Sequence, residues 1–272
     1  DPLTRTVVIT GAAGNIGRKL NAHFTGLGWT TRLLDAHPGE GVEVADLSVW
    51  DEGWVSRFAD ADAVVLLAGD PKPEATWASV VRLNLDLVMN VYEAAVAQRA
   101  KRVIFASSNW TMAGHRFADG PLTTDREPCP VNAYGMSKLV GERIGRSYAH
   151  RHGLSSISFR IGWIQRGENR PGPHMKWADW GQGMWLSDRD MAQAFEKAVA
   201  APADVRFAVL NLMSANPGMR WDIETTRKVL GYVPQDGAEP VVTPEQAQGR
   251  EITRRTREMV EAAEAWMRDT RW

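Results

Sequence analysis

The sequence predicts an α/β fold built on a doubly wound parallel sheet, followed by a small carboxy-terminal region. Short apolar runs rich in Val, Ile and Leu recur along the chain, which is the pattern of strands buried on both faces. Segments with a helical spacing of apolar residues lie between these runs, and the alternation indicates parallel strands joined by helices. A glycine-rich turn directly after the first run fits the same architecture.

Strands are predicted where an apolar run is short and bounded by turn residues. Seven segments meet this description: 6–10, 30–35, 41–46, 63–69, 102–108, 155–162 and 206–213. Helices are expected at 17–28, at 80–98, in the segment that contains YGMSK, at 188–200 and at 244–272. The segment 162–185 mixes Gly, Pro and Trp with basic residues and is interpreted as binding loops over the sheet. We therefore expect a main domain, 1–162, and a region of loops and helices interleaved with the last strands, 163–272.

The composition of the 272-residue chain restricts the classes of function. Cys129 is the only cysteine, so no intrachain disulfide can form, and a cytoplasmic location is expected. A net charge of −1 removes the general attraction on which nucleic-acid and anionic-membrane binding relies, so neither partner is expected. No apolar run approaches the length of a membrane-spanning helix, and the amino end leads into a strand rather than a signal segment.

The turn TGAAGNIG, residues 10–17, has the features of a phosphate-binding turn. Gly11, Gly14 and Gly17 stand between a strand and a helix, where small residues let the backbone approach a pyrophosphate. A helix that begins near Asn15 offers free N–H groups and the positive end of its dipole to that charge, and Ile16 lies in the same turn. Such glycines also serve tight strand–helix packing, but the strand context favours a dinucleotide-binding (Rossmann) site.

Residues at the ends of later strands complete the expected cofactor site. Asp35 closes the second strand, where a carboxylate can accept hydrogen bonds from the adenosine ribose and repel a 2′-phosphate. NAD is therefore expected rather than NADP, and Arg32, which would favour a phosphate, lies inside the strand. A turn-initiating role is the alternative for Asp35, and a helix N-cap role is an equal alternative for Asp46. Further cofactor contacts are assigned to Asp46, Leu47, Ala68, Gly69 and Ile161.

The stretch YGMSK contains an acid/base pair. Tyr134 and Lys138 are four residues apart and share one face of a helix. A phenol with a pKa of about 10 is a poor base at neutral pH, and a fixed neighbouring cation stabilises its phenolate. The strand upstream ends in SSNW, and alternation along a strand turns only one of Ser107 and Ser108 toward a cleft.

These motifs in this order, TGxxGxxG, Asp, SSN and YxxxK, resemble the extended short-chain dehydrogenase/reductase superfamily as far as residue 165. The resemblance implies that Tyr134 moves the proton at the reacting oxygen, that Lys138 lowers the pKa of the phenol and holds the nicotinamide ribose, and that Ser108 orients the substrate. It also implies an ordering or proton-relay role for Asn84, for which capping or packing is an equal alternative. Relatives of this kind often form homodimers through the helices that carry YxxxK and Asn84.

Within the superfamily the chain is most similar to uronate dehydrogenases, which oxidise the anomeric carbon of hexuronic acids with NAD. Those enzymes typically carry His after SSN and Ser after RIG, whereas this chain has Trp110 and Trp163. We expect Asn109, Trp110 and Trp163 at the substrate. Arg170 or His174 is expected to hold a substrate anion, with a solvated basic loop as the alternative. No metal site is expected.

The expected activity is NAD-dependent oxidation of a hydroxyl group, that of the anomeric carbon included, on a small sugar or sugar acid. A nucleotide-sugar epimerase that uses NAD transiently is one alternative, although the chain is short for it. A non-catalytic NAD-sensing regulatory protein is the other, although Tyr134 and Lys138 are both present. Asn109 and Trp110 stand where the dehydratase branch usually has an acidic pair, which argues against dehydration.

Overall fold

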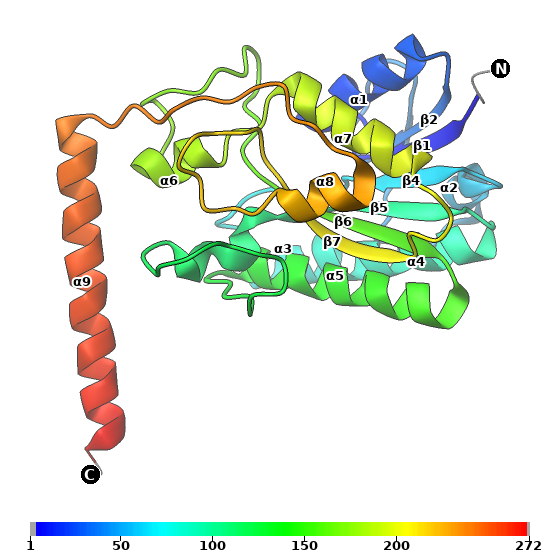
Figure 1. The fold of residues 1–272 in the computed structure, drawn as a ribbon. Coiled ribbons are helices and arrows are strands. Elements are labelled where there is room, and N and C mark those ends of the chain that lie inside the picture. Colours follow the sequence, from blue (N-terminus) through cyan, green and yellow to red (C-terminus); the bar gives the residue numbers. More distant parts are fainter. Residues whose placement is uncertain (1–3, 271–272) are drawn as a thin grey trace.

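The structure, a computed structural model, describes residues 4–270. A seven-stranded sheet forms its centre in the order β3-β2-β1-β4-β5-β6-β7, and all neighbouring strands are parallel (Figure 1). The strands are β1 (Thr6–Thr10), β2 (Thr30–Asp35), β3 (Val42–Val44), β4 (Ala63–Leu66), β5 (Arg102–Ser108), β6 (Ser155–Ile161) and β7 (Phe207–Leu212). Because the strand order reverses between β1 and β4, the sheet is doubly wound, and the predicted fold class is confirmed.

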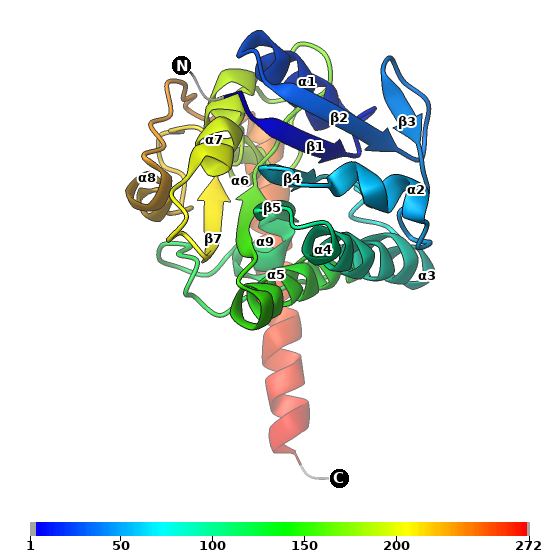
Figure 2. The ribbon, with the colours of Figure 1, turned by 90° about the vertical axis from the view of Figure 1, so that its right-hand side faces the viewer.

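Helices cover both faces of the sheet (Figure 2). On one face, α1 (Asn15–Gly26) and α7 (Asp188–Ala200) bury Leu20, Phe24 and Phe195 against the strands. On the other face, α4 (Leu87–Ala97) and α5 (Ala133–His152) bury Tyr92 and Tyr148, and α2 (Glu52–Val55) completes that layer. The two buried layers fix the strands and hold the carboxyl edge of the sheet in place.

Several elements differ from the sequence prediction. The helix expected at 80–98 is α3 (Trp77–Val80), a π-helical segment η2 (Val81–Asp86) and α4 in succession. The predicted binding loops contain a short helix, α6 (Ala178–Gly183), so their description as loops alone is wrong. Short 3₁₀ segments, η1 (Ser56–Phe58) and η3 (Asn109–His115), and the helix α8 (Glu224–Leu230) are not predicted.

The chain beyond β6 forms an aromatic cluster and a long terminal helix. Trp163, Trp177 and Trp180 pack on a small core that contains Met184 and Trp221. The terminal helix α9 (Pro244–Asp269) begins at a capping box and leads away from the sheet (Figures 1 and 2). Within residues 4–270, no helix combines the length and the apolar character needed to cross a membrane.

Candidate active site

A cleft of about 950 Å³ lies along the carboxyl ends of the strands, where the strand order reverses. Doubly wound sheets bind ligands at this position. All residues assigned from the sequence to the cofactor line the cleft: Gly11, Gly14, Asn15, Ile16, Gly17, Asp35, Asp46, Leu47, Ala68, Gly69, Lys138 and Ile161. Ser108, Asn109, Trp110, Tyr134 and Trp163 line it as well, whereas Asn84, Arg170 and His174 lie outside its lining.

The glycine turn is shaped by close backbone approaches. Gly11 has a φ of +71°, and a Cβ at this position would lie 2.8 Å from the backbone nitrogen of Ala68. A Cβ on Gly17 would lie 2.4 Å from the carbonyl oxygen of Gly11. Helix α1 follows Gly14, and no side chain caps its first turn. The N–H groups of that turn therefore remain available to an anion.

Asp35 connects the end of β2 to the glycine turn. Its carboxylate accepts hydrogen bonds from the backbone N–H groups of Ala13, at 3.0 Å, and His37, at 2.9 Å. Asp35 therefore stabilises the turn that follows β2, and its carboxylate still has lone pairs that can accept hydrogen bonds from a ligand.

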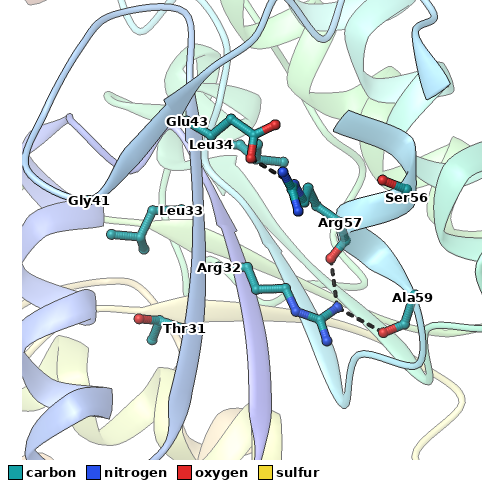
Figure 3. A pocket seen from close by; sticks show the side chains of 9 residues that line it. All are labelled: Thr31, Arg32, Leu33, Leu34, Gly41, Glu43, Ser56, Arg57 and Ala59. Atoms are coloured by element: carbon teal, nitrogen blue, oxygen red, sulfur yellow. Dashed lines mark hydrogen bonds and ion pairs between the residues drawn. The ribbon is translucent and has the colours of Figure 1, made fainter. Parts of the chain in front are cut away.

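Arg32 lies in a separate groove between β2, β3 and η1 (Figure 3). Its guanidinium donates to the carbonyl oxygens of Arg57 and Ala59, both at 2.8 Å, and Arg57 pairs with Glu43. These bonds hold Arg32 outside the cleft, so it offers no cation to a 2′-phosphate there.

Asp46 lies at the cleft but does not cap a helix. Its carboxylate accepts hydrogen bonds from the backbone and hydroxyl of Ser48 and pairs with Arg82. The hydroxyl bond from Ser48 is the main cause that holds the pKa of Asp46 below its usual value. The N-cap of α2 is Asp51, which accepts from the N–H of Gly53.

Tyr134, Ser108 and Lys138 meet where β5 ends and α5 begins. Asn132 caps α5 by accepting a hydrogen bond from the N–H of Gly135, which places Tyr134 in the first turn. The Ser108 hydroxyl lies near enough to the phenol to lower its pKa. Lys138 Nζ donates to the carbonyl oxygen of Ala106 at 2.8 Å and lies 5.5 Å from the centroid of the Tyr134 ring. The three side chains therefore converge on one position in the cleft.

Burial is the main cause of the pKa shifts of Tyr134 and Lys138. It raises the pKa of Tyr134 to about 12, opposed by the hydrogen bond from Ser108. Burial also lowers the pKa of Lys138 from its usual 10.5 to about 8. The phenol is therefore protonated at neutral pH, whereas the lysine is still mostly charged. The pKa of the phenol is therefore raised, and not lowered as the neighbouring Lys138 predicts.

The two adjacent serines of β5 face opposite sides. Ser107 donates to a carboxylate oxygen of Glu142 at 2.6 Å, and Arg160 holds both oxygens of that carboxylate at 2.8 and 2.9 Å. Ser108 instead accepts from the N–H of Trp110 at 3.2 Å, at the start of η3. The hydroxyl group near Tyr134 therefore belongs to Ser108, as alternation along the strand predicts.

Asn84 lies behind the first turn of α5. Its amide group donates to the hydroxyl of Ser137 at 3.1 Å and to the carbonyl of Asp70, and its oxygen accepts from the N–H of Asp70 at 2.7 Å. Ser137 in turn donates to the carbonyl of Tyr134 at 2.7 Å. These contacts fit the ordering role, because Asn84 connects the segment after β4 to the turn that carries Tyr134.

Tryptophan rings form the wall of the cleft beyond Ser108. Trp177 packs edge-on against Trp110, with ring centroids 5.4 Å apart, and lies 5.5 Å from Trp163. Asn109 has a structural role: its side chain donates to the carbonyl of Ile161 at 2.9 Å and connects the end of β5 to the end of β6. Trp177 lies in the segment 162–185, where Trp is interleaved with basic residues, but its place at the cleft is not predicted from the sequence.

The structure does not bring Arg170 or His174 into the cleft. Arg170 pairs with Glu168 at 2.6 Å, and His174 contacts the side chain of Gln165 at 2.6 Å. Both side chains are exposed, and neither lines the cleft. Arg166 and Lys176, from the same basic segment, line the cleft instead.

A protein-family model decides the affiliation of the chain. The model of the NAD dependent epimerase/dehydratase family matches residues 7–165, which include the glycine turn, Ser108, Tyr134 and Lys138. The chain belongs to this family.

Sugar dehydrogenases are among the similar proteins. The L-arabinose 1-dehydrogenase (NAD(P)(+)) of Haloferax volcanii is 34% identical over 251 residues, which cover 87% of this chain and 98% of that protein. The NAD-dependent glucose-6-phosphate dehydrogenase of the same organism is 34% identical over 257 residues, covering 87% and 95%. A solved uronate dehydrogenase from Agrobacterium tumefaciens, a mutant complexed with NAD, is 27% identical with a TM-score of 0.74 and covers 86% of each chain.

The cleft fits the dinucleotide that the family name implies. The turn around Gly11 and Gly17 has no room for side chains, the first turn of α1 is uncapped, and Asp35 stands at the end of β2. In the part of the chain that the structure describes, no three His, Cys, Asp or Glu side chains gather so that they could hold a metal ion.

Proposed function

We propose that the protein is an NAD-dependent dehydrogenase that oxidises a hydroxyl group of a small sugar or sugar acid. The observation that carries the proposal is the convergence of Ser108, Tyr134 and Lys138 in the same cleft as the glycine turn. The relatives named above, which act on sugars according to their names, support the substrate class.

Some residues of the chain bind NAD, and others bind the substrate and transfer its proton. The glycine turn and α1 hold the diphosphate of NAD, Asp35 holds the adenosine ribose, and Lys138 holds the nicotinamide ribose. When bound, NAD supplies the hydride acceptor. Ser108 donates a hydrogen bond to the reacting oxygen, and the hydroxyl proton passes to the phenolate of Tyr134. Since burial raises the pKa of Tyr134 to about 12, the charge of Lys138 is needed to favour that phenolate.

A panel of aldoses, hexuronates and sugar phosphates, each offered with NAD and with NADP, tests the proposal by the absorbance of reduced cofactor. We expect NADH to accumulate with at least one sugar and NADP to be used poorly. Interconversion of sugars without net NADH would indicate an epimerase. NAD binding without turnover on the whole panel would indicate a non-catalytic NAD-binding protein.

We further propose that an anionic group of the substrate contacts Arg166 and Lys176. Both side chains are exposed at the cleft, and no hydrogen bond or ion pair to either is seen within residues 4–270. A charge-assisted hydrogen bond is worth about 1.5–3 kcal/mol, so Arg166→Gln or Lys176→Gln should raise KM for a sugar acid or sugar phosphate by roughly tenfold or more. KM for a neutral sugar should stay unchanged.

Arg170→Gln is the matched control, because it removes a cation of the same loop that pairs with Glu168 outside the cleft. Its KM values should equal those of the wild type. Equal effects of Arg166→Gln and Arg170→Gln, or an effect of both cleft variants on KM for NAD alone, would contradict the assignment.

A homodimer in the cytoplasm completes the proposal. Exposed apolar side chains on α4 and α5, namely Met89, Met136 and Val140, support association through these two helices. The single cysteine suits a reducing compartment. In sedimentation velocity, Val140→Glu should sediment more slowly than the wild type, because it places a charge in this contact; equal sedimentation would contradict association through α4 and α5.

A further inference from the structure

Helix α9 contacts the body of the molecule near its amino end. Gln246 donates to the carbonyl of Pro173 at 2.6 Å, and Arg250 pairs with Asp179 of α6 at 2.8 Å. Further along, Arg254, Arg255 and Arg257 pair with glutamates of α9 itself. Figures 1 and 2 show the helix continuing away from the sheet. From Ile252 to Asp269 it extends for about 27 Å at 1.5 Å per residue.

The projecting part of α9 carries an apolar stripe on one face. Ile252, Met259, Val260 and Met267 are between 51% and 73% exposed. With Thr256 and Ala263 between them, these residues follow the spacing 4, 3, 1, 3 and 4, which keeps them on one side of a helix. Helices in proteins owe most of their stability to the packing of such a face, and an exposed apolar face of this kind marks an interface.

Charge is segregated along the same helix. Residues 250–257 contain four arginines and one glutamate, whereas residues 258–269 contain four acidic side chains and one arginine. Two parallel copies would place like charges side by side. Two antiparallel copies place the basic part of each beside the acidic part of the other, which favours association.

We propose that α9 pairs in an antiparallel manner with α9 of a second copy of this chain. The stripe is symmetric about the point between Met259 and Val260, so a two-fold axis there superposes the stripe on itself, as an isologous contact requires. In this register Thr256 of one copy lies level with Ala263 of the other, and these small side chains let the helices approach closely. The contact uses neither α4 nor α5, and it is independent of the proposed catalytic activity.

Disulfide cross-linking of the full chain tests both the pairing and its direction. In a Cys129→Ala background, Thr256→Cys and Ala263→Cys are made as separate single-cysteine proteins, mixed, oxidised mildly and separated on a non-reducing gel. A disulfide needs Cα atoms within about 7 Å. We expect a covalent dimer from the mixture and little from either variant alone, because two copies of residue 256 are offset by about 10 Å in the antiparallel pair.

Arg254→Cys mixed with Ala265→Cys is the matched control. These residues share the same level in the proposed register but lie on the opposite side of the helix, so they should stay unlinked. Circular dichroism confirms that each variant keeps its helix content. If Thr256→Cys alone and Ala263→Cys alone each form as much covalent dimer as their mixture does, the helices pair in a parallel manner and the proposal is overturned. Absence of cross-links in the mixture, or equal cross-linking of the control pair, would overturn it as well.

Discussion

Ser107 and Ser108 are neighbours on β5, yet the structure predicts opposite consequences for their removal. Ser107→Ala removes a 2.6 Å hydrogen bond to the buried carboxylate of Glu142, which keeps both bonds from Arg160. A hydrogen bond to a charged group is worth about 1.5–3 kcal/mol, so the free energy of unfolding should fall by about that amount. At roughly 2–4 °C per kcal/mol, Tm should fall by about 3–12 °C while kcat stays close to that of the wild type.

Ser108→Ala removes the hydroxyl group that contacts Tyr134. Loss of one preorganised donor at a reacting oxygen lowers kcat by about a hundredfold to a thousandfold. The Trp110 N–H also loses its acceptor, which costs about 0.5–2 kcal/mol of stability. Thermal unfolding and steady-state NADH formation, measured on both variants, separate the two roles. A comparable loss of kcat in both variants, or a loss in Ser107→Ala alone, would refute the assignment.

Three further predictions concern groups around the cleft. Burial lowers the pKa of Lys138 to about 8, so the charged lysine destabilises the fold below that pH, and this free-energy penalty disappears by pH 10.5. In urea unfolding without cofactor, the stability of the wild type relative to Lys138→Met should therefore rise between pH 8 and pH 10.5. A stability difference that does not change with pH would be inconsistent with the buried charge. Asp35→Asn keeps an acceptor for Ala13 but loses the charge, so the ratio of kcat/KM for NAD over NADP should fall by about tenfold or more, and an unchanged ratio would remove Asp35 from cofactor selection. Glu142→Ala leaves Arg160 buried without a counter-ion, which should cost about 3–5 kcal/mol in urea unfolding; a loss below 1 kcal/mol would show that the pair is not buried as described.

The parts of the site that regular structure determines could be predicted from the sequence. The glycine turn follows a buried strand and precedes a helix, so its position at the carboxyl edge of a parallel sheet is a consequence of topology. Ser108 could be separated from Ser107 because side chains alternate along a strand. Tyr134 and Lys138 could be paired because a helix brings residues four apart onto one face.

The anion-binding residues could not be predicted in the same way, because a loop has no period. Gly167 adopts a φ of +68° directly after Arg166 and turns the chain, so that Arg170 pairs with Glu168 outside the cleft. The direction of each basic side chain depends on this turn and on contacts such as those of Asn15 and Lys19 with the carbonyl of Gln165. Such contacts join residues far apart in the sequence, and no local pattern records them.

The direction of the pKa shift of Tyr134 could not be predicted from its neighbours in the sequence either. A lysine four residues away predicts a lowered pKa for the phenol, but burial of the ring raises that pKa, although Ser108 acts in the opposite direction. Burial is a property of the assembled fold, so only the structure reveals the direction of this pKa shift.

The most direct test of the catalytic proposal is Tyr134→Phe, assayed with the sugar that gives the highest rate of NADH formation. This variant removes one oxygen atom and keeps the ring. We expect kcat to fall by about a hundredfold to ten-thousandfold, which is the usual contribution of a positioned acid/base group, while NAD binds by calorimetry as it does to the wild type. Turnover equal to that of the wild type, with the same affinity for NAD, would contradict the assignment of Tyr134 as the group that takes the proton.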